Sequence, residues 1–88
     1  MNVSRLIGIY EKHGDKHLND VSINLPIDIL TDILNVDKED DPYVYKPYDI
    51  NKSQFEKLTG LVPELKKYDF DKYFFSYECF NEDYGKWK

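Results

Sequence analysis

Alanine is absent from the 88 residues, and arginine and cysteine occur only once each, as Arg5 and Cys79. A single cysteine excludes an internal disulfide, so packing alone must hold the chain together. With one arginine, the chain nearly lacks the planar guanidinium fork that reads phosphates and base edges. The net charge of −5 disfavours direct contact with nucleic acid as well. The composition therefore predicts no direct nucleic-acid binding and favours a basic partner.

Long apolar runs are also missing, since no stretch approaches the ~18 residues that would span a bilayer. No charged-then-apolar leader opens the chain, because Met1 to Arg5 runs straight into a strand-like pattern. A free cysteine is typical of a reducing compartment. We expect a cytoplasmic protein that does not enter a membrane.

Metal sites find little support in the sequence. A calcium loop that starts at Asp37 would need glycine at its sixth position and glutamate at its twelfth, where Pro42 and Tyr48 stand. His13 and His17 are four residues apart, but a predicted turn separates them and no third ligand is evident. We expect surface histidines and no metal or other cofactor.

Catalytic groups are equally sparse. Cys79 lies in an apolar strand-like segment, far in sequence from both histidines, and is predicted to pack as a small hydrophobe. Asp40 and Asp41 are adjacent carboxylates in a polar stretch, where we expect both to be hydrated. The 4 glycines are scattered and form no phosphate-binding loop. The chain is predicted not to be an enzyme.

Three segments have the alternation of strands. Residues 3–12 carry apolar groups on both faces, which predicts a central strand, and the turn residues 13–16 lead to a second, half-buried strand around 21–25. These two strands should form a hairpin. A third strand is predicted for residues 73–80, where tyrosine and phenylalanine are concentrated.

Two segments have the periodicity of helices. Pro26 suits a first helical position, and the helix should end near Asn35 or Val36, with Thr31 among its outward residues. Its inward residues are Ile27, Leu30, Ile33 and Leu34. Asn51 and Gln54 predict a capping box at the start of a second helix, with Gly60 as its stop. The predicted inward residues there are Phe55, Leu58, Leu61 and Val62.

The order strand, strand, helix, helix, strand indicates an α+β fold, in which two helices cover one face of a small antiparallel sheet of about three strands. Residues 1–88 are expected to form a single domain, with 81–88 as a polar tail.

The most distinctive stretch is residues 37–48, here named the acid–tyrosine loop. Seven acids and two lysines between residues 28 and 49 give this region a balance of −5, equal to that of the whole chain. Acids steer a cationic partner, and tyrosines supply rigid contact area with a polar tip. The alternative is a solvated loop whose tyrosines pack back onto the sheet. The predicted partner-binding residues are Asp37, Glu39, Asp40, Asp41, Tyr43, Tyr45 and Tyr48.

The chain resembles small bacterial immunity proteins, which are encoded beside colicin-like or contact-dependent growth inhibition toxins. The features that carry the resemblance are the opening hairpin, the segment 25–30, the Asp40-Asp41-Pro42 turn leading to Tyr48-Asp49-Ile50, the capped helix and the strand 73–77. The resemblance implies stoichiometric binding to the C-terminal domain of a toxin, commonly a basic nuclease. Some nuclease immunity proteins are helical bundles, from which the three predicted strands set this chain apart.

Other functions stay open at this point. An acidic mimic of nucleic acid that inhibits a DNA-binding enzyme is one alternative, although mimics usually spread their acids over much of the surface. An enzyme of unknown type and an interaction module of a larger assembly are the others. The oligomeric state cannot be predicted from these residues.

Overall fold

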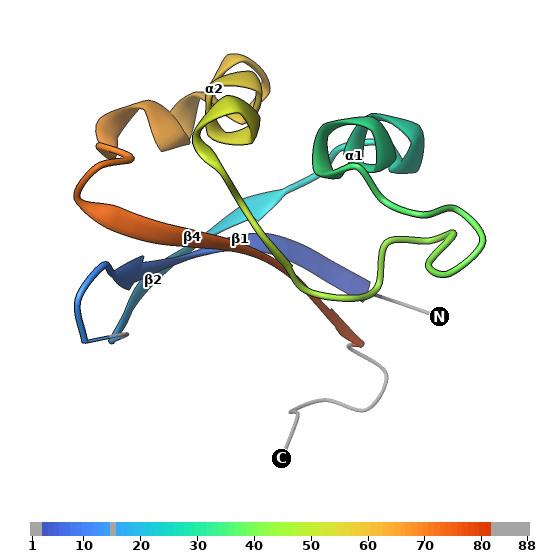
Figure 1. Cartoon of the computed structure of the whole chain (residues 1–88), viewed down its shortest axis with the longest axis horizontal. Coiled ribbons are helices and arrows are strands. Elements are labelled where there is room, and N and C mark those ends of the chain that lie inside the picture. The colour runs from blue at the N-terminus through green and yellow to red at the C-terminus, as the bar shows by residue number, and fades with distance from the viewer. Residues whose placement is uncertain (1–2, 15, 82–88) are drawn as a thin grey trace.

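A computed structural model describes residues 3–14 and 16–81 and shows an α+β fold (Figure 1). Four strands form an antiparallel sheet in the order β2-β1-β4-β3, and the helices α1 and α2 lie on one face of it. The predicted tail residues 82–88 and Asp15 of the predicted turn lie outside the described residues. The elements in chain order are β1 (Val3–Glu11), β2 (His17–Ile23), α1 (Ile27–Leu34), β3 (Tyr48–Asp49), α2 (Lys52–Leu61), the 3-10 helix η1 (Pro63–Lys67) and β4 (Tyr73–Asn81).

The predicted hairpin and the central strand are confirmed. β1 pairs with β2 on one side and with β4 on the other, so that Ile7 lies between Val21 and Tyr77. Ile7 and Ile9 are fully buried, as expected where apolar groups of a central strand face the helices. The count of three strands was one short, because the two-residue β3 pairs with β4 at the edge of the sheet.

Helix α1 ends where the sequence predicts, at Leu34, and Asn35 follows in the left-handed conformation. Pro26 is the N-cap and not the first helical residue. The prediction that Thr31 points outward was wrong: its side chain is buried. Its hydroxyl donates to the carbonyl of Ile27 at 2.8 Å, which satisfies the polar group inside the helix and allows the burial.

Helix α2 begins with the predicted capping box, in which the Asn51 side chain accepts from the Gln54 N–H at 2.8 Å and the Gln54 side chain accepts from the Asn51 N–H at 2.9 Å. Gly60 is not the stop, because α2 continues through Leu61 and Val62 caps it. Leu61 was expected in the core but is 50% exposed. Leu58 and Val62 occupy the inward positions, and η1 then turns the chain away before Leu61 can pack.

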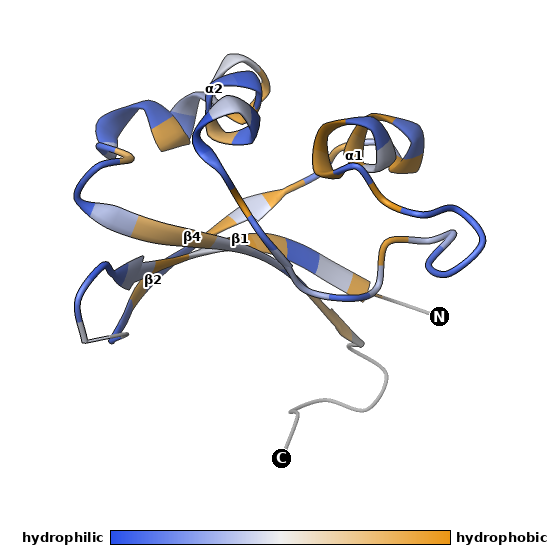
Figure 2. Cartoon of the chain, viewed as in Figure 1, coloured by the Kyte–Doolittle hydropathy of each residue, from blue (hydrophilic) through white to orange (hydrophobic). Residues whose placement is uncertain are grey.

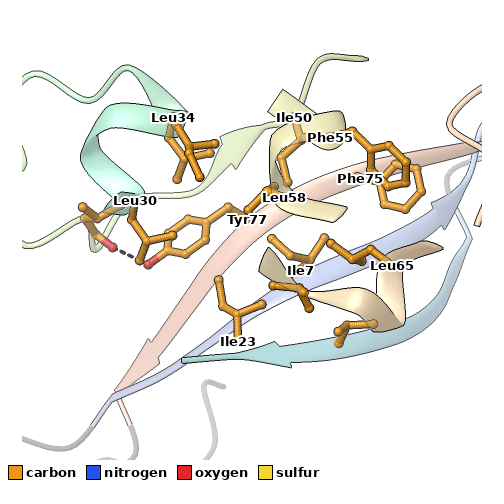
Figure 3. Close-up of a cluster of buried hydrophobic side chains, with 14 of the residues drawn as sticks. Ile7, Ile23, Leu30, Leu34, Ile50, Phe55, Leu58, Leu65, Phe75 and Tyr77 are labelled. Carbon is orange, nitrogen blue, oxygen red and sulfur yellow. Dashed lines mark hydrogen bonds between the residues drawn. The ribbon is translucent and has the colours of Figure 1, made fainter. Parts of the chain in front are cut away.

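The core lies between the sheet and the helices and is drawn in Figure 3. Ile7, Phe75 and Tyr77 project from the sheet, while Leu30 and Leu58 descend from α1 and α2 to meet them. Figure 2 shows the corresponding pattern, with hydrophobic segments on the strands and on the inward sides of the helices. Within the described residues, no helix is both long and apolar enough to cross a membrane.

Candidate functional site

The acid–tyrosine loop connects the end of α1 to β3 and, as predicted, contains no long regular element. Its first turn forms around Asp37, whose carbonyl accepts from the Asp41 N–H at 2.9 Å. The Asp37 carboxylate accepts from the backbone N–H of Glu39 at 2.9 Å, which is a local aspartate turn. In Figure 2 this part of the loop forms a hydrophilic bulge beside α1.

Asp41 is the residue that organises the second half of the loop. Its carboxylate accepts the backbone N–H of Tyr45 at 2.9 Å, the N–H of Lys46 at 3.0 Å and the hydroxyl of Tyr48 at 2.7 Å. The expectation that Asp41 is hydrated was wrong, since it is only 4% exposed. Buried carboxylates persist where donors surround them, and these three donors provide that environment. Asp41 therefore shapes the loop from inside.

These contacts shift two pKa values. Burial raises the pKa of Asp41, but the bonds from Tyr45, Lys46 and Tyr48, together with the Lys46 charge, outweigh it, so the net pKa lies below its usual value. Burial and the bond to Asp41 raise the pKa of Tyr48 to about 12. Asp41 is thus an anion and Tyr48 a neutral donor at neutral pH, as their hydrogen bond requires.

Val44 anchors the loop to the core. It is fully buried, and its carbonyl accepts the Tyr77 hydroxyl at 2.7 Å, the bond dashed in Figure 3. Its φ of 56° lies in the left-handed region, which is unusual for a β-branched residue and costs on the order of 1–3 kcal/mol. The surrounding contacts hold this strained conformation in place.

The consequence of this anchor is the exposure of its two neighbours. Tyr43 is 59% exposed and Tyr45 is 44% exposed, and their ring centroids lie 5.8 Å apart. Turning Val44 inward leaves both rings outside, side by side. Tyr48 differs from them, because it is half-buried and its ring lies 6.3 Å from that of Tyr77.

Arg5 was not among the predicted site residues, yet it ties the loop to β1. Its Nη2 donates to the Tyr43 carbonyl at 2.9 Å, and its Cζ lies 6.0 Å from the centre of the Tyr45 ring, at the limit of a cation–π contact. The only signal in the sequence was its isolation as the sole arginine. A contact across 38 positions cannot be predicted from local pattern.

The exposed acids are Asp37, Glu39 and Asp40. Asp40 forms an exposed ion pair with Lys46 at 2.6 Å, which raises the pKa of Lys46 and offsets part of the negative charge. The structure thus brings six predicted residues together around Asp41, but divides them by role. Tyr43, Tyr45 and the three exposed acids form the outer surface, while Asp41 and Tyr48 support it from within.

Other chemistry receives little support from the geometry. Within residues 3–14 and 16–81, no three His, Cys, Asp or Glu side chains are grouped so that they could hold a metal ion. Burial raises the pKa of the Cys79 thiol, which keeps it in the less nucleophilic protonated form at neutral pH.

Comparison with known proteins identifies one family. Residues 4–78 match the model described as a domain of unknown function, DUF7683. Neither the curated proteins nor the solved structures gave a match.

Proposed function

The chain belongs to the DUF7683 family, and we propose that it is a binding protein of the immunity type. It would neutralise the C-terminal domain of a cognate bacterial toxin, a basic RNase or DNase, by stoichiometric contact in the cytoplasm. It performs no catalysis in this proposal. The sequence resemblance to immunity proteins and the outer surface of the acid–tyrosine loop support it.

One observation carries the proposal: Tyr43 and Tyr45 are displayed as a pair on a loop that is held rigidly. Exposed aromatic side chains normally lose contact with water when a protein folds, and here a strained, buried Val44 keeps them outside. Backbone strain clusters at functional positions, and tyrosine is enriched among residues that dominate binding energy. A preformed loop also loses little conformational entropy on binding.

The charges around the pair indicate the kind of partner. Asp37, Glu39 and Asp40 lie on the same loop, and Asp28 and Asp32 are exposed on the neighbouring helix α1. A nuclease that holds phosphates presents basic side chains to such a surface. Complementary charge can raise association rates to about 10⁸–10⁹ M⁻¹s⁻¹ at low salt, which suits the rapid neutralisation of a toxin.

The first test uses the C-terminal domain of the large secreted protein whose gene adjoins this one. Cells that express this domain should stop growing, and co-expression of the chain should restore growth. The purified pair should form a 1:1 complex. If the adjacent gene encodes no such protein, or if its toxic domain is neither bound nor neutralised, the proposal is wrong.

Charge-reversed variants locate the surface. Glu39→Lys combined with Asp40→Lys should slow association with the toxin domain about tenfold at low salt and flatten its salt dependence. Asp71→Lys is the matched control, because Asp71 is exposed in the turn before β4, which lies away from the loop in Figure 1. Equal rates for both proteins would place the binding surface elsewhere.

Truncation of the tyrosines tests the aromatic half of the surface. Tyr43→Ala and Tyr45→Ala should mainly speed dissociation, each costing about 1–3 kcal/mol of binding energy. Leu61→Ala removes a comparably exposed apolar group from α2 and should leave dissociation unchanged. A nucleic-acid mimic would show the opposite pattern, in which the acids matter and the tyrosines do not.

A further inference from the structure

The outer edge of β4 is covered over a very short length. β3 contributes the pairs Tyr48–Tyr77 and Asp49–Ser76, and the Ile50 N–H then donates to the Phe75 carbonyl at 3.0 Å. In an antiparallel ladder, every second residue directs its N–H and C=O to the same neighbour. The backbone groups of Phe75 and Tyr77 therefore point towards β3.

Cys79 is the next residue of β4 whose backbone points the same way. Continuing the register would place Lys46 opposite Cys79, but the Lys46 N–H donates to the Asp41 carboxylate at 3.0 Å and so turns away from β4. No residue in the described part of the chain pairs with Cys79 on this edge. Asp41 thus holds the loop and, by the same bonds, leaves the β4 edge open.

A hollow of about 260 Å³ lies along this edge, lined by Pro47, Glu78, Cys79 and Phe80. Neighbouring residues of a strand point to opposite faces, so three consecutive lining residues share only the strand's edge. The lining is mainly apolar. Glu78 and the exposed Asp49 lie on the face of the sheet opposite the helices, since Ser76, the partner of Asp49, is two residues before Glu78.

We propose that an extended segment of the cationic partner pairs with this open edge of β4. Its backbone would bond to Cys79, an apolar side chain would enter the hollow, and a basic side chain would meet Glu78 and Asp49. Unpaired N–H and C=O groups at a strand edge are satisfied by another extended backbone, which determines the occupant's conformation. Pro47 belongs to both the acid–tyrosine loop and the hollow, so one partner can cover both.

This inference rests on the proposed function and adds a second contact to it. The acids near the edge disfavour a second copy of this chain, because pairing two β4 edges would bring Glu78 and Asp49 of each copy close together. Sedimentation of the free protein tests that point. A dimer that Cys79→Pro dissociates would overturn the proposal in favour of self-association.

Hydrogen exchange in the complex with the toxin domain is the main test. In the free protein the Cys79 amide should exchange at least about tenfold faster than the Phe80 amide, which faces β1, and binding should slow it about tenfold or more. A complex whose formation slows no exchange at Cys79 overturns the edge contact and leaves the proposed function intact. A toxin domain that does not bind at all refutes both.

Two variants provide an independent measurement. Cys79→Pro removes the outward N–H without removing a bond to β1 and should weaken binding about tenfold, as expected for one lost backbone hydrogen bond. Cys79→Ala keeps the N–H and should change affinity less than about threefold. Equal affinity of the two variants contradicts the proposal, and if Cys79→Pro fails to fold, the exchange measurement decides.

Discussion

The substitution Asp41→Asn tests whether the loop depends on a buried carboxylate. Asparagine has nearly the same shape as aspartate but replaces one oxygen with an NH₂ donor. The Asp41 carboxylate accepts from the Tyr45 N–H through Oδ1, and from the Lys46 N–H and the Tyr48 hydroxyl through Oδ2. Whichever way the amide turns, at least one of these donors then faces another donor.

The magnitude follows from the number of lost acceptors. A hydrogen bond to a charged group contributes about 1.5–3 kcal/mol, so the loss of one such bond should lower the free energy of unfolding by about that amount at pH 7. Asp40→Asn is the matched control on the neighbouring residue. The ion pair of Asp40 with Lys46 is exposed, and its loss should cost at most about 1 kcal/mol.

The pH dependence has a definite sign. Because folding lowers the pKa of Asp41, its stabilising contribution is fully present above the usual value of 3.8 and is lost as the pH falls through the lower native pKa. Asn cannot titrate. The difference in stability between the wild type and Asp41→Asn should therefore be largest at neutral pH and shrink below about pH 3.8.

Urea unfolding followed by circular dichroism at pH 7 and at pH 3 measures both quantities. The expected result is a large loss for Asp41→Asn at pH 7, a small loss for Asp40→Asn, and convergence of wild type and Asp41→Asn in acid. If Asp41→Asn is as stable as Asp40→Asn at pH 7, the carboxylate does not organise the loop, and the assignment of its role is refuted.

Two further predictions concern the support beneath the loop. Tyr77→Phe removes the donor to the buried Val44 carbonyl and should lower the free energy of unfolding by about 1–3 kcal/mol, which thermal and urea unfolding would detect; an unchanged value would mean that the Val44 conformation does not need this bond. Leu58→Ala should cost about 2–5 kcal/mol because the side chain is fully buried, whereas Leu61→Ala in the same helix should be nearly neutral, and equal losses would contradict the described orientation of α2.

Local pattern was sufficient for much of the fold. The hairpin of β1 and β2, the end of α1 near Asn35 and the capping box at Asn51 follow from residues that are close in sequence, and the structure shows all three. Turn residues, caps and strand alternation act over a few positions, so the sequence contains them directly. The α+β class follows from the order of these elements.

Local pattern failed where burial depends on distant contacts. Gly60 and Leu61 were predicted from helical period alone, but η1 redirects the chain and leaves Leu61 in solvent. The two-residue β3 was too short to give a periodic signal of its own. Its pairing with β4 exists because the loop delivers Tyr48 to that edge.

The acid–tyrosine loop separates the two sources of information most clearly. By itself the sequence determined that acids and tyrosines are concentrated in residues 37–48, and that this stretch would not form a long regular element. Only the tertiary structure decided that Asp41 turns inward while Tyr43 and Tyr45 turn outward, because Val44 must reach the Tyr77 hydroxyl and the core. Adjacent residues of the same type acquire opposite roles when one of them is needed to satisfy buried donors.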